Sequence, residues 1–135
     1  MKIRKVALII FYDENKRILL QDRRGISKLG EEWGFFGGEI GKGETSEHAV
    51  VRETKEELDF DLKEYKYVGE YSYKIKDIFV IGKVFISPLK NNLLKFKQIE
   101  GKNMQLFSLE EAEKLKMVCE GDIEMVRRLK KILSD

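Results

Sequence analysis

The sequence predicts an α/β (α+β) fold in which a mixed β-sheet packs between α-helices. Apolar runs typical of strands and apolar residues at helical spacing both occur, and they follow one another without strict alternation. The chain has 135 residues, of which 42% are hydrophobic. It is therefore long enough to bury a sizeable core and has the usual length of one domain, residues 1–135.

The first elements are expected to be two strands and a loop. Residues 6–12 are rich in strand formers, and residues 18–21 return as a second strand after a polar turn. Residues 23–32 are polar and contain two glycines, which predicts a loop, and residues 33–36 are a short strand. Five glycines then lie between residues 34 and 43. That density suits tight turns or a backbone that approaches a ligand closely.

A helix is predicted to follow the glycines. Thr45 or Ser46 can cap its start, and Glu47 lies in its first turn, where an acidic side chain is favourable. The helix is expected to end near Leu58. Its core-facing residues are predicted to be Ala49, Val50 and Leu58.

The second half of the chain is predicted to add strands at 66–74 and 78–87, a loop at 88–95 and a short extended piece at 106–107. Residues 78–87 are almost continuously apolar, which is typical of a central strand buried on both faces.

Two helices are predicted to close the chain. Ser108 and Glu111 form a capping box that opens a short helix ending near Leu115. Gly121 is expected to separate it from a last helix. The apolar residues of that last helix recur at helical spacing: Met125, Val126, Leu129, Ile132 and Leu133.

The predicted central helix carries a cluster of carboxylates. Glu53, Glu56 and Glu57 are spaced to share one helical face, and Glu44 lies just upstream among the glycines. Like charges at this spacing destabilise a helix by a few tenths of a kcal/mol per pair. A divalent cation would reverse that effect, and Mg²⁺ prefers hard oxygen ligands of this kind.

On the helix alone, the ordinary interpretation is a solvated acidic face, partly balanced by Arg52 and Lys55. The wider spacing argues against it, because five residues separate Gly38 from Glu44 and seven more lead to Arg52. This pattern strongly resembles the Nudix box, and seven of its nine specified positions match, which makes the resemblance specific. The matching residues are Gly38, Glu44, Arg52, Glu53, Glu56, Glu57 and Phe60.

Two positions of the box depart from the family pattern. Thr54 replaces an apolar residue, and Asp59 replaces a glycine and is therefore expected to adopt the left-handed conformation. The resemblance extends to 33–38, which is similar to the family's lead-in with Phe36 in place of proline, and to 107–111, which resembles its closing strand and helix. It implies the Nudix fold, a mixed sheet between helices.

The resemblance also implies a metal site and its ligands. It makes Glu56 and Glu57 the main ligands of Mg²⁺, with Mn²⁺ able to substitute. Glu53 is implied as a further ligand or as the catalytic base, and the backbone carbonyl of Gly37 or Gly38 is implied to complete the shell.

Further roles are implied outside these ligands. Arg52 is expected to hold the carboxylates by ion pairing, and Glu44 to be an outer ligand or a partner that stabilises the loop. Glu100 is the candidate for the distant glutamate that many members add as a ligand or base. Arg23, and less specifically Arg24, are candidates for binding substrate phosphate, for which an arginine fork is well suited.

Composition limits the kinds of binding partner and the cellular compartment that we expect. The net charge of +2 argues against a stable nucleic-acid partner, and no apolar stretch approaches the roughly 18 residues of a membrane helix. The single cysteine, Cys119, rules out an intrachain disulfide and fits a reducing compartment. We expect a cytoplasmic monomer or homodimer that binds a small nucleotide, with His48 at the surface.

Three functions remain open. The first is a MutT-like nucleoside triphosphate pyrophosphohydrolase, for which the oxidised nucleotide 8-oxo-dGTP is one candidate substrate. The second is cleavage of ADP-ribose, another nucleotide sugar or a dinucleoside polyphosphate. The third is a non-catalytic nucleotide-sensing module, which loss of Glu53, Glu56 or Glu57 would favour; all three residues are present.

Overall fold

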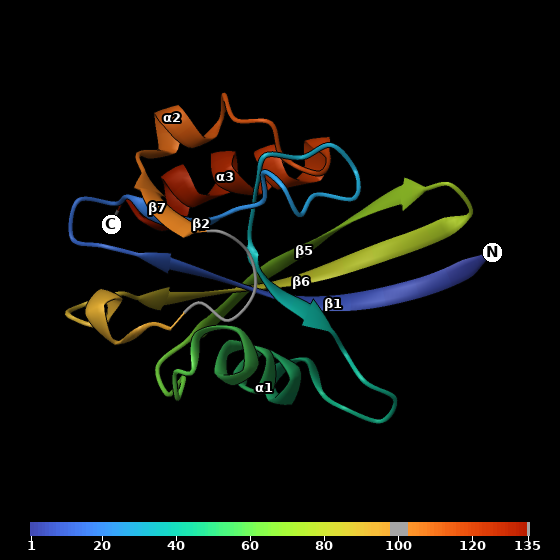
Figure 1. Cartoon of the computed structure of the whole chain (residues 1–135), viewed down its shortest axis with the longest axis horizontal. Coiled ribbons are helices and arrows are strands. Elements are labelled where there is room, and N and C mark those ends of the chain that lie inside the picture. Colours follow the sequence, from blue (N-terminus) through green and yellow to red (C-terminus); the bar gives the residue numbers. More distant parts are fainter. Residues whose placement is uncertain (98–102, 135) are drawn as a thin grey trace.

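In the computed structural model, which describes residues 1–97 and 103–134, seven strands form one sheet with helices on both of its faces (Figure 1). The strands are β1 (Lys2–Tyr12), β2 (Ile18–Asp22), β3 (Trp33–Gly34), β4 (Phe36–Glu39), β5 (Lys66–Ile75), β6 (Ile78–Pro88) and β7 (Asn103–Phe107). The helices are α1 (Ser46–Leu58), α2 (Leu109–Ala112) and α3 (Glu120–Ile132), with a 3-10 turn at Leu93–Lys95. In Figure 1, α1 lies on one face of the sheet and α2 and α3 lie on the other.

Strand β1 joins the parts of the sheet. It pairs in parallel with β6 along its whole length, and β5 pairs antiparallel with β6. Along its other edge, β1 pairs antiparallel with β4 and, at Tyr12, with β2, which also pairs with β3 and β7. One parallel pair among antiparallel ones makes the sheet mixed. The predicted fold class is therefore confirmed, and β6 is central as predicted.

The side chains of β1 enter two separate cores by strict alternation. Ala7, Ile9 and Phe11 pack in the core beneath α1, whereas Ile10 packs in the core beneath α3. Because successive strand residues point to opposite faces, a strand covered on both faces is apolar almost throughout. The predicted core residues of α1 are completely buried: Ala49, Val50 and Leu58.

The ends of α1 follow the predicted local chemistry. The hydroxyl of Thr45 accepts a hydrogen bond from the backbone N–H of His48 at 3.1 Å, so Thr45 is the N-cap. Asp59 ends the helix in the left-handed conformation, with φ 52° and ψ 40°, as its position in the box predicts. Buried Thr54 donates its hydroxyl proton to the carbonyl of Val50 at 2.7 Å, so its polar group is satisfied inside the core.

Three local predictions are wrong. The glycine-rich segment was expected to follow a single short strand, but it contains β4, because Gly37 and Gly38 pair with β1. Gly121 lies within α3 rather than before it. A Cβ at Gly121 would lie 2.5 Å from the ring of Tyr71, so glycine there allows α3 to pack closely on β5. Finally, α2 ends at Ala112, short of Leu115.

Candidate active site

Two glycines of β4 let the strand lie close to its neighbour β1 and to the side chain of Glu53 on α1. At Gly37, where φ is +142°, a Cβ would lie 2.1 Å from the carbonyl oxygen of Ala7. At Gly38, a Cβ would lie 2.4 Å from the carboxyl carbon of Glu53. Any side chain at Gly38 would therefore occupy the space in which the Glu53 carboxylate lies against the strand.

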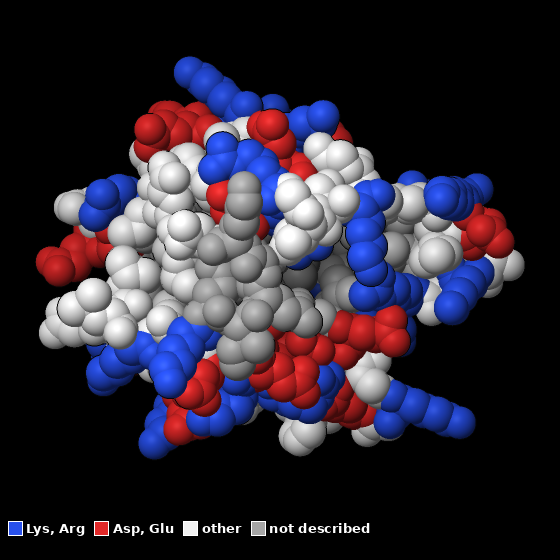
Figure 2. All heavy atoms as spheres, in the orientation of Figure 1, with Lys and Arg blue, Asp and Glu red and all other residues white. Residues whose placement is uncertain are grey.

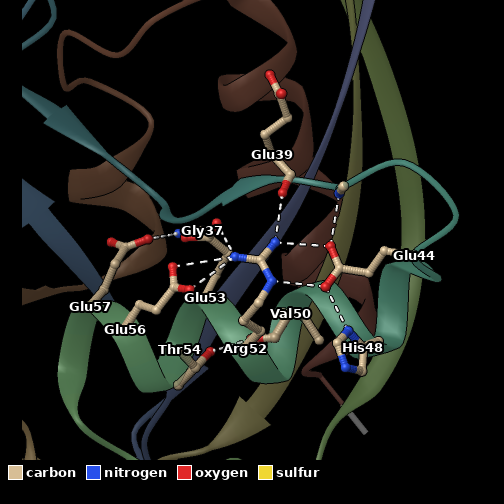
Figure 3. Close-up of polar contacts among 11 residues, drawn as sticks. Gly37, Glu39, Glu44, His48, Val50, Arg52, Glu53, Thr54, Glu56 and Glu57 are labelled. Carbon is tan, nitrogen blue, oxygen red and sulfur yellow. Dashed lines mark hydrogen bonds and ion pairs between the residues drawn. The ribbon is translucent and has the colours of Figure 1, made fainter.

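Arg52 is the centre of the polar contacts on α1 (Figure 3). Its Nε and Nη2 atoms donate to the two carboxylate oxygens of Glu44 at 2.8 and 2.9 Å, a bidentate pair. Its Nη1 donates to Glu53 at 2.9 Å and to Glu56 at 3.2 Å, and its Nη2 also donates to the carbonyl of Glu39 at 2.9 Å. One guanidinium thus joins three carboxylates and the end of β4.

Glu44 is turned toward the protein. Besides Arg52, it accepts from the backbone N–H of Gly41 at 2.8 Å and contacts Nδ1 of His48 at 2.5 Å. The hydrogen bonds from Arg52, followed by that from Gly41, hold the pKa of Glu44 well below its ordinary value. These contacts favour the loop-stabilising role of Glu44, and they place the exposed His48 beside it.

The three glutamates of the predicted metal site lie side by side on α1 but differ in environment. Glu57 is 6% exposed and accepts from the backbone N–H of Gly37 at 3.0 Å. The Glu53 side chain is 15% exposed, and that of Glu56 is 56% exposed. Among the described residues, no three acidic, histidine or cysteine side chains converge closely enough to hold a metal by themselves.

A cleft of about 480 Å³ opens beside this helix. Its walls come from β1, from the loop between β2 and β3, from β4, β5 and the start of α3, and it reaches Gly38 and Glu53. Its lining includes Arg4, Leu8, Arg23, Lys28, Phe35, Tyr73 and Asp122. In the space-filling view, acidic side chains gather over α1 with basic side chains around them (Figure 2).

A model of the NUDIX domain family matches residues 2–129. The chain belongs to the Nudix hydrolase family. It is 32% identical over 77 residues to an 8-oxo-dGTP diphosphatase of Escherichia coli (strain K12), a match spanning 57% of this chain and 60% of that relative's length. An 8-oxo-dGTP diphosphatase of Proteus vulgaris is 26% identical over 93 residues, spanning 68% of this chain and 83% of the relative.

Solved structures share the Nudix fold. The crystal structure of a MutT protein from Methanosarcina mazei Go1 aligns with a TM-score of 0.82 at 18% identity, covering 99% of this chain and 97% of that one. Within the described part of this Nudix chain, no helix combines the length and the apolar character needed to cross a membrane.

Hydrolases of the Nudix family generally use a divalent metal ion, and the donors of this site fit one. Mg²⁺ usually takes one or two protein carboxylates and fills its shell with water and substrate phosphate oxygens. A site of that kind needs neighbouring carboxylates beside a substrate cleft, not a closed cage of protein ligands. Glu53, Glu56 and Glu57 are spaced to share one face of α1. Of these three, Glu53 lines the cleft and lies against Gly38.

The other predicted residues of this Nudix site are placed as follows. Arg23 lines the cleft together with Glu53. Arg24 instead pairs with Asp22 at 2.7 Å, and its guanidinium carbon lies 5.0 Å from the ring centre of Trp33. These contacts hold the guanidinium group of Arg24. Glu100 lies outside the described residues.

Sequence reasoning missed polar residues that the fold brings to the cleft. The hydroxyl of Tyr71 donates to the buried carboxylate of Asp122, which also accepts from the backbone N–H of Val118 at 3.0 Å. Burial raises the pKa of Asp122. Asp122 is the third residue of α3, a position that favours acidic residues at any helix start, so its sequence context gave no sign of the cleft.

Proposed function

We propose that the protein hydrolyses a diphosphate bond of a nucleoside triphosphate in the presence of Mg²⁺, releasing a nucleoside monophosphate and pyrophosphate. The observation that carries the proposal is the contact between Glu53 and Gly38, where the carboxylate-bearing helix α1 meets the wall of the cleft. Because two relatives carry the name 8-oxo-dGTP diphosphatase, an oxidised purine nucleotide is the first substrate to test.

We assign the metal to Glu56, Glu57 and Glu53, with the backbone carbonyl of Gly38. Glu100 is proposed as a further ligand or as the base. When bound, Mg²⁺ neutralises phosphate charge and helps to orient the attacking water. The identity of the base stays open between Glu53 and Glu100.

Two arginines around this site are proposed to position the carboxylates and to bind phosphate. Arg52 holds Glu53 and Glu56 in place through its own hydrogen bonds, at 2.9 and 3.2 Å. In-line attack on phosphorus depends on positioning, so carboxylates fixed in this way are already oriented before the substrate arrives. Arg23 is proposed to donate to a phosphate from the cleft wall, where its side chain is 28% exposed.

The proposal is tested with a panel of nucleotides incubated with Mg²⁺ and, separately, with EDTA. The panel contains ordinary and 8-oxo dNTPs, ADP-ribose, sugar nucleotides and dinucleoside polyphosphates, and monoester products are treated with phosphatase before phosphate is measured. We expect Mg²⁺-dependent turnover that is highest for a triphosphate. Preferred turnover of ADP-ribose or a dinucleoside polyphosphate would replace the proposed substrate class. Saturable nucleotide binding with no turnover would indicate a sensing module.

A further inference from the structure

The loop between β2 and β3 is folded around a buried carboxylate. Glu31 is 5% exposed, and its side chain accepts from the hydroxyl of Ser27 at 2.6 Å and from the backbone N–H of Leu29 at 3.1 Å. Its other oxygen accepts from Nε of Arg23 at 2.9 Å. A buried carboxylate is costly unless it is paired and hydrogen-bonded, and Glu31 is both.

These contacts fix Arg23 at two points. While Nε of Arg23 donates to Glu31, its Nη1 donates to the side-chain oxygen of Gln21 at 2.9 Å. The aliphatic stem lies against Gly34, where a Cβ would come within 2.9 Å of the Arg23 Cδ. A guanidinium is planar and rigid, so two anchored nitrogens determine where its other N–H groups point. Those groups belong to a side chain that lines the cleft.

The same loop forms part of the cleft wall. Its ends are joined by the hydrogen bond from the backbone N–H of Arg23 to the carbonyl of Glu32, at 2.8 Å. The backbone N–H of Glu32 and that of Trp33 then donate to the carbonyl of Lys116, at 2.9 and 3.2 Å. Lys28, from the middle of the loop, lines the cleft together with Arg23. The carboxylate of Glu31 thus stabilises, from inside the loop, the part of the cleft wall that carries Arg23 and Lys28.

We propose that Glu31 is a positioning residue, which holds the guanidinium of Arg23 in the orientation that receives a substrate phosphate. Glu31 also lines the cleft, but both of its carboxylate oxygens already accept hydrogen bonds from within the protein, so we assign its effect to Arg23. The inference rests on the proposed function. It adds to that function the residue that orients Arg23, the proposed phosphate-binding side chain. Arg23 bound to an internal carboxylate is oriented before binding, so less conformational freedom is lost when the phosphate arrives.

The test compares Glu31→Gln with Glu32→Gln, because Glu32 is the adjacent glutamate and is exposed. The amide of Glu31→Gln keeps one acceptor oxygen but loses the charge that orients Arg23. A charge-assisted hydrogen bond changes binding by roughly tenfold or more. We therefore expect Glu31→Gln to raise KM for the nucleoside triphosphate about tenfold with a smaller change in kcat, and Glu32→Gln to change neither.

To distinguish a positioning role of Glu31 from a purely structural one, KM is also measured for Glu31→Gln made in the Arg23→Ala background. If Glu31 acts through Arg23, adding Glu31→Gln to Arg23→Ala raises KM no further. An added rise of about tenfold in that background would show that Glu31 acts only by folding the loop, and would overturn the inference. In the proton–nitrogen spectrum of the free protein, the Nε–H signal of Arg23 is expected to be protected from exchange in wild type and Glu32→Gln and unprotected in Glu31→Gln.

The outcomes separate this inference from the proposed function. Wild-type turnover with identical KM values for Glu31→Gln and Glu32→Gln would overturn the role of Glu31 alone. An unprotected Arg23 Nε–H in wild type would do the same without reference to activity. A wild-type protein that neither hydrolyses nor binds any nucleotide of the panel would overturn the proposed function, and the role of Glu31 would fall with it.

Discussion

Substituting Gly38 by alanine is expected to lower turnover strongly while leaving the fold intact. The new Cβ would lie 2.4 Å from the carboxyl carbon of Glu53 and 2.4 and 2.5 Å from its oxygens. Ordinary van der Waals contact begins near 3.4 Å, so the carboxylate must move by about 1 Å. If Glu53 has its proposed role as metal ligand or base, a displacement of that size is expected to lower turnover about 100-fold. Because the carboxylate is the end of a flexible side chain, we expect the free energy of unfolding to change by less than about 1 kcal/mol.

Two neighbouring glycines serve as controls for Gly38→Ala. In Gly37→Ala, the new Cβ would lie 2.1 Å from the backbone oxygen of Ala7, which cannot rotate away, and φ is +142°. That variant should lose about 2–4 kcal/mol of stability. In Gly43→Ala, the Cβ meets nothing within 4 Å, and φ is +78°. We expect a loss of about 1 kcal/mol there, with turnover unchanged.

The assay combines urea unfolding with Mg²⁺-dependent turnover of the best nucleotide from the panel. Activity is measured well below the unfolding transition of each variant, so that differences in turnover report the folded protein. A Gly38→Ala enzyme with wild-type turnover would refute the reasoning, because Glu53 would then act from a position that the structure excludes. A large loss of stability in Gly38→Ala would show that displacing the Glu53 carboxylate costs more free energy of folding than expected.

Three further predictions follow from single side chains. Glu57→Gln keeps an acceptor for the N–H of Gly37 but loses a charge, so Mg²⁺-dependent turnover should fall at least about 100-fold with the melting temperature retained. Asp59→Gly relieves a left-handed φ of 52° and loses a surface ion pair with Lys55; urea unfolding should show a net gain of about 0.5 kcal/mol. Burial would raise the pKa of Glu31, but its hydrogen bonds outweigh burial and lower it below 4.5. Its stabilisation is therefore present above pH 4.5 and lost as the pH falls through the lowered pKa, so Glu31→Gln should be less destabilising at pH 3 than at pH 7.

Each of these three has a result that would contradict it. Undiminished turnover of Glu57→Gln would remove Glu57 from the metal site. Asp61→Gly is the control for Asp59→Gly, because Asp61 also pairs with Lys55, at 3.4 Å, but does not have a positive φ. It should lose stability, and an equal gain in both variants would exclude relief of backbone strain. A stability difference between Glu31→Gln and wild type that is the same at both pH values would exclude the shifted pKa.

Features that depend on local chemistry could be predicted from the sequence. The sequence left the N-cap open between Thr45 and Ser46, and the structure gives Thr45. This cap, the end of α1 at Leu58 and the left-handed Asp59 each involve residues within one or two turns of a helix. The resemblance implied that Arg52 pairs with the carboxylates but left the role of Glu44 open, and the structure places Glu44 and Arg52 in a bidentate pair. Such contacts need no knowledge of what packs above or below them.

Features that depend on tertiary packing could not be predicted. Glu31 and Glu32 are adjacent and chemically identical, yet one is buried around Arg23 and the other is exposed. Nothing in the composition of the loop distinguishes them. Likewise, the contact between Tyr71 and Asp122 joins residues 51 positions apart. Gly121 was interpreted as a break because a helix interior disfavours glycine, but its contact with Tyr71 comes from another element.

The two cores on opposite faces of the sheet divide the molecule into parts that can change separately. The carboxylates belong to the helix over one core, whereas β5, α3 and the loop around Glu31, which form part of the cleft wall, lie on the other side. Substitutions in α3 or in that loop can reshape the pocket without repacking the face of α1 beneath Ala49 and Val50. A directed-evolution library for new substrates should therefore vary α3 and the loop around Glu31 and leave the acidic helix α1 unchanged.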